Sequence, residues 1–340
     1  MKAAVVEGPG LVRVRELPEP EIGEYEARCE QLFGSVCAGT DTHLVEGHPP
    51  FCHWMKPPYI LGHESVGRVV EVGAKVRHLK VGDVITRVGC PAVGDVGSGW
   101  GGFAQIGVAT DWRAMREDGL EGWESKTVEQ VLPPECDPAE GTLFITWRET
   151  LSYVNRMGIG RGARVLIIGT GGNGLAFASH ARNAGAERVV MVGASARRQS
   201  ALDAGATDFS DYRDENCWAE VGRSEPEGFD FGIDAVGKAG LLQQALLQLK
   251  RGGTLGIYGL DDVDSVAVSP MAARGSFTFY NGGYDEAEAH LEVVDHHRSG
   301  RLDPSIWQDR TRIFSLDNIT EALAAVKDRS LIKPLIRLTS

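Results

Sequence analysis

A short run of glycines is the clearest chemical signal in the sequence. The motif G-x-G-x-x-G is formed by Gly169, Thr170, Gly171, Gly172, Asn173 and Gly174. In such a motif the first glycine allows a tight turn, the second lets the backbone approach a pyrophosphate, and the third permits close packing of a helix on a strand. A helix that begins there also presents N–H groups and the positive end of its dipole to phosphate. The run therefore predicts a dinucleotide site.

The neighbours of the motif decide how much weight it carries, because glycine triplets also occur in ordinary turns. The apolar run at 164–168 directly precedes it and predicts a buried strand, and a helical pattern begins at Leu175. A strand, a glycine loop and a helix in this order are the context that dinucleotide binding requires. The alternative, a flavodoxin-like turn that binds no nucleotide, fits this context less well.

The end of the next expected strand bears on which dinucleotide binds. Sites for NAD usually place Asp or Glu there, about 20 residues beyond the motif, to bind the ribose 2′-hydroxyl. Here Gly193 takes that place and is followed by Ser195, Arg197 and Arg198. The missing carboxylate and the two guanidinium groups favour a 2′-phosphate, and hence NADP(H) over NAD(H). The alternative is that both arginines only solvate the start of a helix.

Alternating strands and helices are expected to position this site. Expected strands at 164–168, 188–192, 229–233 and 254–258 alternate with expected helices at 175–184, 197–204 and 240–249. This alternation predicts an α/β fold with a doubly wound parallel sheet. The first 110 residues differ, because short β-branched runs between Gly and Pro turns predict a β-rich domain.

Length and composition exclude several classes of protein. With 340 residues the chain is expected to form two domains. The formal net charge of -12 argues against a nucleic-acid partner, and no apolar run reaches the roughly 18 residues that would cross a membrane. The six cysteines are scattered without a Cys-x-x-Cys pair, which is typical of free thiols in a cytoplasmic protein.

Several strings along nearly the whole chain resemble those of the medium-chain dehydrogenase/reductase superfamily, in its zinc-dependent alcohol and polyol dehydrogenase branch. They lie at 39–47, 61–67, 81–84, 169–174, 234–237 and 251–253. The resemblance implies a GroES-like catalytic domain over 1–147 and 287–340, and a Rossmann coenzyme domain over 148–286. It also implies that Val236 and Gly259 contact the coenzyme and that the active site lies in the cleft between the two domains. Members of the family form homodimers or homotetramers, so the same is expected of this protein.

The zinc ligands are where the sequence departs from this family. The catalytic metal of the family takes a Cys before the Gly-Thr-Asp string, the His of Gly-His-Glu, and a later Cys or Glu. Here Ala38 stands at the first position, and a strand that continued to Cys37 would point that thiol to the opposite face unless the backbone bulges. His63, with Glu64 beside it, remains, and Glu149 is the nearest candidate for the third ligand.

Catalytic zinc normally has three protein ligands, so a bound catalytic zinc is left open by the sequence. A structural zinc is not expected, because the loop at 89–102 contains only Cys90 where the family's lobe has four cysteines.

The proton-handling residues of the family are better preserved. In the family a Thr and a His pass the alcohol proton outward through the nicotinamide ribose, and Thr40 and His43 stand at these positions. A hydroxyl that donates and accepts, next to an imidazole that titrates near neutral pH, suits a relay. The alternative is a helix-capping turn with His43 exposed. Asp41 either orients His63 or caps the helix.

Three hypotheses follow. The first is an NADP(H)-dependent oxidoreductase that transfers hydride to or from a small alcohol, carbonyl or activated C=C substrate without catalytic zinc, with Thr40, His43 or His63 polarising the substrate. The second is a zinc-dependent alcohol, polyol or sugar dehydrogenase with unorthodox ligands. The third is a non-catalytic NADPH-binding protein.

Overall fold

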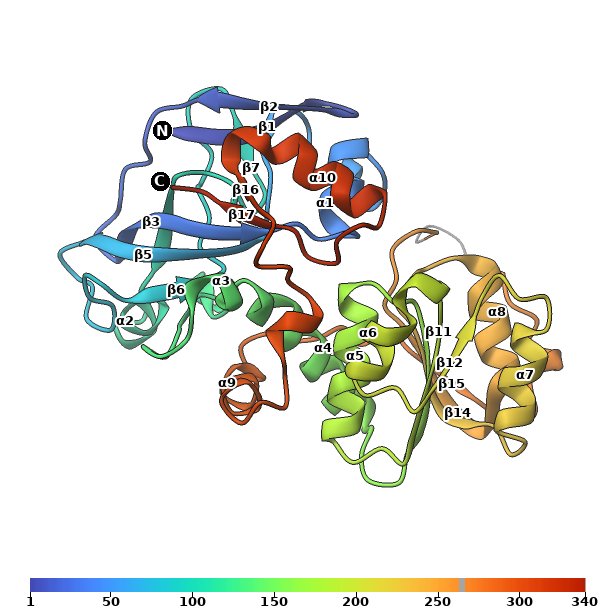
Figure 1. Cartoon of the computed structure of the whole chain (residues 1–340). Helices are drawn as coiled ribbons and strands as arrows, with labels where there is room; N and C mark the ends of the chain where they lie inside the picture. Colours follow the sequence, from blue (N-terminus) through green and yellow to red (C-terminus); the bar gives the residue numbers. More distant parts are fainter. Residues whose placement is uncertain (263–266, 340) are drawn as a thin grey trace. The chain divides into compact units, whose positions relative to one another are not determined.

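The chain folds into two compact units (Figure 1). The structure, a computed structural model, describes residues 1–262 and 267–339. Met1–Ile145 and Trp307–Ser340 form the first unit, and Thr146–Ile306 form the second. The long helix α4 (Leu143–Met157) leads from the first unit into the second.

The first unit is β-rich, as the sequence predicts. Among the described residues its larger sheet has the order β16-β17-β3-β5-β6-β9, with β8 paired to β3, and its smaller sheet has the order β2-β1-β4-β7. The larger sheet contains β3 (Glu26–Ser35), β5 (Glu64–Val72), β6 (Val84–Thr86), β8 (Ile106–Thr110), β9 (Gln130–Val131), β16 (Ile313–Ser315) and β17 (Leu335–Arg337). The smaller sheet contains β1 (Lys2–Gly8), β2 (Leu11–Glu16), β4 (Tyr59–Ile60) and β7 (Gly97–Ser98).

Two pairings in the larger sheet position the chemistry of this unit. Strands β3 and β5 are antiparallel, with Ser35 opposite Glu64, so the segment after β3 meets the residues just before β5. The C-terminal strand β17 pairs with the same end of β3, with Leu335 opposite Ser35. The C-terminal tail therefore returns to the first unit.

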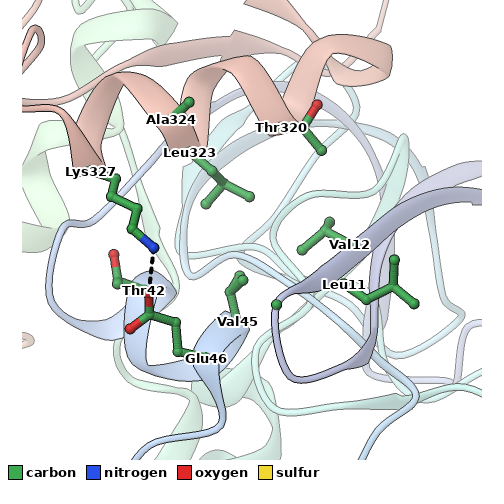
Figure 2. A pocket seen from close by; sticks show the side chains of 10 residues that line it. Leu11, Val12, Thr42, Val45, Glu46, Thr320, Leu323, Ala324 and Lys327 are labelled. Carbon is green, nitrogen blue, oxygen red and sulfur yellow. Dashed lines mark hydrogen bonds and ion pairs between the residues drawn. The ribbon is translucent and has the colours of Figure 1, made fainter.

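Short helices surround these sheets. They are α1 (Thr40–Glu46), α2 (Trp112–Glu117), α3 (Pro138–Gly141) and α10 (Ile319–Lys327), with 3₁₀ turns η1 (Phe51–His53), η2 (Glu124–Lys126) and η6 (Leu316–Asn318). The turn between β1 and β2, α1 and α10 enclose an apolar groove of about 400 Å³ (Figure 2). Val45 and Leu323 line it, and an ion pair of Lys327 with Glu46 (2.9 Å) lies at its edge.

The second unit is a doubly wound parallel sheet, which confirms the predicted fold class. The strand order is β12-β11-β10-β13-β14-β15. The order reverses between β10 and β13, with three strands on each side of this switch point. The strands are β10 (Arg164–Ile168), β11 (Arg188–Gly193), β12 (Asp208–Asp211), β13 (Phe229–Asp234), β14 (Leu249–Ile257) and β15 (Thr278–Tyr280). Ligands of such sheets bind outside the carboxyl ends of the strands at the switch point.

Helices cover both faces of this sheet, α5 and α6 on one and α7 and α8 on the other (Figure 1). Besides α4, the helices of this unit are α5 (Gly172–Asn183), α6 (Arg198–Asp203), α7 (Cys217–Ser224), α8 (Ala239–Gln248) and α9 (His290–Arg298), with 3₁₀ turns η3 (Ser195–Arg197), η4 (Pro270–Ala272) and η5 (Pro304–Ile306). Helix α5 begins at Gly172 instead of Leu175, because the end of the glycine motif itself forms the first turn. Nowhere in the described residues does a helix have both the length and the apolar character that a membrane crossing needs.

The segment around α9 belongs to the second unit, whereas the sequence places the return to the first domain at 287. Two contacts explain this difference. Arg156 of α4 pairs with Glu288 (2.7 Å), and Asn155 donates a hydrogen bond to Glu292 (3.1 Å). These contacts hold α9 against α4, so the compact units divide at Trp307.

Candidate active site

The glycine loop between β10 and α5 has the geometry that its spacing predicts. Gly169 has a φ of +108°, a conformation that favours glycine. A Cβ at Gly174 would lie 2.1 Å from the carbonyl oxygen of Gly169, so only glycine lets the helix approach the strand. A Cβ at Gly171 would meet no atom within 4 Å, so this position faces open space. The loop thus leaves room for a ligand at the N-terminal end of α5.

Asn173 and Thr146 connect this loop to its surroundings. The Asn173 amide donates to the Tyr258 hydroxyl (3.2 Å), and its carbonyl oxygen accepts from the Thr146 hydroxyl (3.5 Å). The Tyr258 hydroxyl in turn donates to the Glu149 carboxylate (3.1 Å). Glu149, the sequence's candidate for a third metal ligand, therefore takes part in a hydrogen-bond chain of the second unit.

The loops that follow β13 and β14 lie at the same edge of the sheet. The Asp234 carboxylate accepts hydrogen bonds from the backbone N–H groups of Val236 (2.9 Å) and Gly237 (3.1 Å). Burial raises the pKa of Asp234, and these two hydrogen bonds lower it by a smaller amount. A Cβ at Gly259 would lie 2.0 Å from the Gly237 nitrogen, and a Cβ at Gly169 would lie 3.0 Å from Val236. Val236 thus packs beside the glycine loop, and Gly259 packs against Val236 and Gly237.

The end of β11 presents the groups that the sequence assigns to the coenzyme ribose. Hydrogen bonds from the Arg213 backbone and from the Ser195 side chain and backbone lower the pKa of Asp211. Arg198 donates to the Phe209 carbonyl (3.4 Å), and its guanidinium lies 5.6 Å from the centre of the Phe209 ring. Ser195 and Arg198 are therefore directed toward β12, while Arg197 is half-buried in η3.

Sequence reasoning missed the residues that follow β12. Gly193 lies opposite Asp211 in the parallel pairing, and the Tyr212 N–H donates to the Gly193 carbonyl (3.1 Å). Arg213 is exposed, and its guanidinium lies 5.5 Å from the centre of the Tyr212 ring. The Asp-Tyr-Arg string could have pointed to these residues only if the strand before it had been recognised. That strand, β12, has the sequence Asp-Phe-Ser-Asp and is too short and polar to be predicted as a strand.

In the first unit the structure brings together a thiol, an imidazole and a carboxylate. One ligand atom each from Cys37, His63 and Glu64 lie within 4.8 Å of one another, and all three side chains are buried. The condition under which Cys37 would point to the opposite face, a strand that continues to it, is not met, because β3 ends at Ser35. Ala38 stands where the family has a cysteine, but Cys37 supplies the thiol of this cluster instead.

Asp41 holds two members of this cluster. Its carboxylate accepts a hydrogen bond from the Cys37 N–H (2.8 Å) and lies 3.1 Å from Nδ1 of His63. Of the two possible roles of Asp41, the structure therefore has it orienting His63, and the residue before α1, Gly39, makes no side-chain cap. Burial lowers the pKa of His63, but the Asp41 carboxylate and Cys37 outweigh it and raise the pKa well above its ordinary value.

A lysine from the C-terminal tail completes these surroundings. The Lys333 ammonium group donates to the Glu64 carboxylate (2.5 Å), and both side chains are buried. A buried carboxylate needs such a partner, because isolated charges are costly away from water. Sequence reasoning missed Lys333, since nothing near it in the sequence points to Glu64.

The donor set fits a zinc ion. Zinc prefers thiolate, imidazole and carboxylate ligands, and catalytic sites have three of them. With Nδ1 of His63 facing Asp41, Nε2 is left as the metal-binding atom, at 3.9 Å from the Glu64 carboxylate. Cys37, His63 and Glu64 could therefore hold zinc.

The predicted proton relay lies on α1. Thr40 is the first residue of the helix. His43 is buried, and its Nδ1 lies 2.8 Å from the Pro49 carbonyl oxygen. A carbonyl only accepts hydrogen bonds, so the proton of the neutral ring is on Nδ1 and Nε2 is an acceptor. The alternative of an exposed His43 is therefore wrong.

Aromatic side chains stand beside His63. The Trp100 ring centre lies 5.7 Å from that of His63. Trp54 and Phe51 pack edge to face on Trp100, at 5.7 Å and 5.8 Å, and Trp54 is 55% exposed. These rings form an apolar surface next to the donor set.

A sheet with a glycine loop at its switch point, in one chain with a β-rich unit that carries zinc-type donors, defines the class of two-domain dehydrogenases. Family comparisons agree with it. Residues 28–118 match the model of the alcohol dehydrogenase GroES-like domain, and residues 172–282 match that of the zinc-binding dehydrogenases.

Relatives and solved structures extend this match to the whole chain. The NADP-dependent isopropanol dehydrogenase of Thermoanaerobacter brockii is 30% identical over 370 residues, which cover 99% of this chain and 100% of the relative. The 2R,3R-butanediol dehydrogenase of Bacillus subtilis has a TM-score of 0.81 at 22% identity, over 99% of both chains. A Sinorhizobium meliloti 1021 protein solved bound to NADP has a TM-score of 0.78 at 25% identity, over 99% of this chain and 98% of that one.

The chain therefore belongs to the medium-chain dehydrogenase/reductase superfamily, in its alcohol and polyol dehydrogenase branch, and it is an alcohol dehydrogenase-like oxidoreductase. This confirms the predicted family and the combination of a GroES-like with a Rossmann domain.

Proposed function

We propose that this protein is an NADP(H)-dependent alcohol dehydrogenase that interconverts a small alcohol and its carbonyl compound. The observation that carries the coenzyme preference is Gly193 at the end of β11, where an NAD site usually has an acidic side chain. The Thermoanaerobacter brockii relative is an NADP-dependent isopropanol dehydrogenase, which supports the same preference.

The coenzyme is expected to bind at the switch point of the second unit. Its pyrophosphate would lie at the N-terminus of α5, over the open position at Gly171. Arg197 and the exposed Arg213 would flank a 2′-phosphate from the ends of β11 and β12. The Asp211 carboxylate would repel the same phosphate. The preference for NADP(H) would therefore depend on the attraction by two arginines exceeding the repulsion by one carboxylate.

Hydride transfer from an alcohol leaves its hydroxyl proton to be taken up by the protein. Thr40 and His43 are the groups we assign to this step. The Thr40 hydroxyl can accept that proton while donating its own, and Nε2 of His43 is an acceptor because Nδ1 faces the Pro49 carbonyl. His43 thereby acts as the general base of the relay.

The donor set of Cys37, His63 and Glu64 favours the zinc-dependent hypothesis over the zinc-free one. A zinc ion held there would act as a Lewis acid on the substrate oxygen. Asp41 orients two of these residues, and Lys333 neutralises the charge of Glu64. Glu149 and a structural zinc are not needed for this proposal.

The aromatic surface of Phe51, Trp54 and Trp100 favours a substrate with an apolar substituent over a polyol. The predictions of a homodimer or homotetramer and of a cytoplasmic location are retained as part of the proposal.

Turnover by the purified chain of 340 residues tests this proposal. Initial rates with NADP⁺ and NAD⁺ would be measured on apolar secondary alcohols and on polyols such as sorbitol, before and after removal of metal by a chelator. We expect NADP⁺-dependent oxidation of the apolar alcohols that is lost on chelation and restored by Zn²⁺. His43→Ala should lower kcat by about 10²-fold or more. Full activity after verified removal of the metal would refute the zinc part, and absence of NADP⁺-dependent turnover on every substrate would refute the function.

A further inference from the structure

Thr170 occupies the space where position 193 would carry a side chain. A Cβ placed on Gly193 would lie 2.2 Å from Cγ2 of Thr170, 2.5 Å from its Oγ1 and 2.9 Å from its Cβ. Real Cβ atoms essentially never approach a heavy atom this closely, so something would have to shift. Rotation about χ1 of Thr170 moves Cγ2 and Oγ1 but leaves its Cβ at 2.9 Å, which is still closer than real Cβ atoms approach a heavy atom.

The backbone conformation does not explain the glycine. Gly193 is the last residue of the extended strand β11, where it pairs with Asp211 of β12. Side chains of L-residues are compatible with an extended strand. The buried side chain of Thr170 is therefore the feature that opposes a side chain at position 193.

The position of this contact gives it a chemical consequence. Thr170 follows the first glycine of the loop, and Gly193 stands where NAD sites usually place the carboxylate that binds the ribose 2′-hydroxyl. The turn and the pyrophosphate need glycines and backbone N–H groups, and neither needs a β-branched side chain at 170.

We propose that Thr170 is a determinant of coenzyme specificity, because its side chain excludes a ribose-binding carboxylate from position 193. The proposal rests on the proposed NADP(H) dependence for the direction of the preference. In this account residues 170 and 193 act as a pair, so an acidic residue at 193 becomes compatible with the fold only when residue 170 loses its side chain.

A stability measurement tests the steric part without any coenzyme. Gly193→Ala would be made in the wild type and in Thr170→Gly, and urea unfolding midpoints would be compared. We expect a clear fall of the midpoint in the wild-type background and little or no fall in the Thr170→Gly background. Gly240→Ala is the matched control, because a Cβ added to this exposed glycine of α8 would meet no atom within 4 Å and the substitution should not lower the midpoint. Equal falls for Gly193→Ala in both backgrounds would overturn the proposal.

Coenzyme binding tests the specificity part. Dissociation constants of NADPH and NADH would be measured by nicotinamide fluorescence for the wild type, Gly193→Asp and the double variant Thr170→Gly/Gly193→Asp. We expect the single variant to fold poorly or to bind both coenzymes weakly. The double variant should shift the affinity ratio toward NADH by at least about tenfold, which corresponds to about 1.4 kcal/mol.

The outcomes separate this inference from the proposed function. A double variant that fails to fold while Thr170→Gly folds, or a single variant that shifts the ratio as far as the double one, would overturn the role of Thr170. A wild type that prefers NADH would refute the proposed coenzyme, whereas the unfolding midpoints would still report whether Thr170 excludes a side chain at 193.

Discussion

Replacement of His180 is expected to change how the stability of the protein depends on pH. His180 lies on α5, the helix that begins at the glycine loop, and its side chain is fully buried. Its ring stacks on that of His296 from α9, with 6.3 Å between the ring centres. Burial, with a smaller contribution from His296, lowers the pKa of His180 to about 3.

The magnitude follows from the difference between the folded and the unfolded chain. An unfolded histidine has a pKa of about 6.5. Above that pH neither the folded nor the unfolded chain binds the proton, so stability is unaffected. Below it the unfolded chain binds a proton that the folded chain does not bind until about pH 3, so the folded state becomes less stable. At pH 5 this difference lowers the free energy of unfolding by about 2 kcal/mol.

Urea unfolding at pH 7.5 and pH 5.0, followed by far-UV circular dichroism, measures this effect. We expect the free energy of unfolding of the wild type to fall by about 2 kcal/mol more between these pH values than that of His180→Gln, which does not titrate. His53→Gln, at an exposed position in the first unit, is the matched control and should keep the wild-type pH dependence. The same pH dependence in His180→Gln and the wild type would refute the reasoning.

Three further substitutions address the other charged groups. Asp41→Asn should weaken zinc binding about 10–100-fold, measured by competition with a chromogenic chelator, because the carboxylate facing His63 is lost; unchanged affinity would contradict the assigned donor set. Asp211→Asn should tighten NADPH binding several-fold and leave NADH nearly unchanged in fluorescence titrations, since a negative charge beside the 2′-phosphate is removed; an equal effect on both coenzymes would contradict this placement. Burial raises the pKa of Glu129 to about 7, so ionisation of this carboxyl destabilises the fold as pH rises from about 4.5 through 7. Glu129→Gln should therefore be more stable than the wild type at pH 8 by about 3 kcal/mol in urea unfolding and should lose this advantage at pH 4; an advantage independent of pH would contradict the cause.

The sequence predicted the coenzyme unit well because its elements leave strong local signals. A parallel strand buried on both faces is a continuous apolar run, and the predicted strand at 164–168 coincides with β10. The edge strand β12 left no such signal, because its two aspartates stand at the ends of four residues. Arg213 was missed for this reason, although it follows a strand that ends beside Gly193.

The first unit was harder to predict, since its site depends on where strands end and on distant partners. The direction of the Cys37 side chain was left open, because the sequence does not reveal that β3 ends at Ser35. Lys333 reaches Glu64 from the C-terminal tail, and only the antiparallel pairing of β17 with β3 brings them together. Such tertiary contacts leave no periodic pattern in the sequence.

The dissociation constants of NADPH and NADH for the unmodified protein measure the proposed coenzyme preference without any knowledge of the substrate. With Gly193 in place of an acidic residue, and with Arg197 and Arg213 proposed to flank the 2′-phosphate, we predict that NADPH binds at least about tenfold more tightly than NADH at moderate ionic strength. Equal affinities, or tighter binding of NADH, would contradict the account.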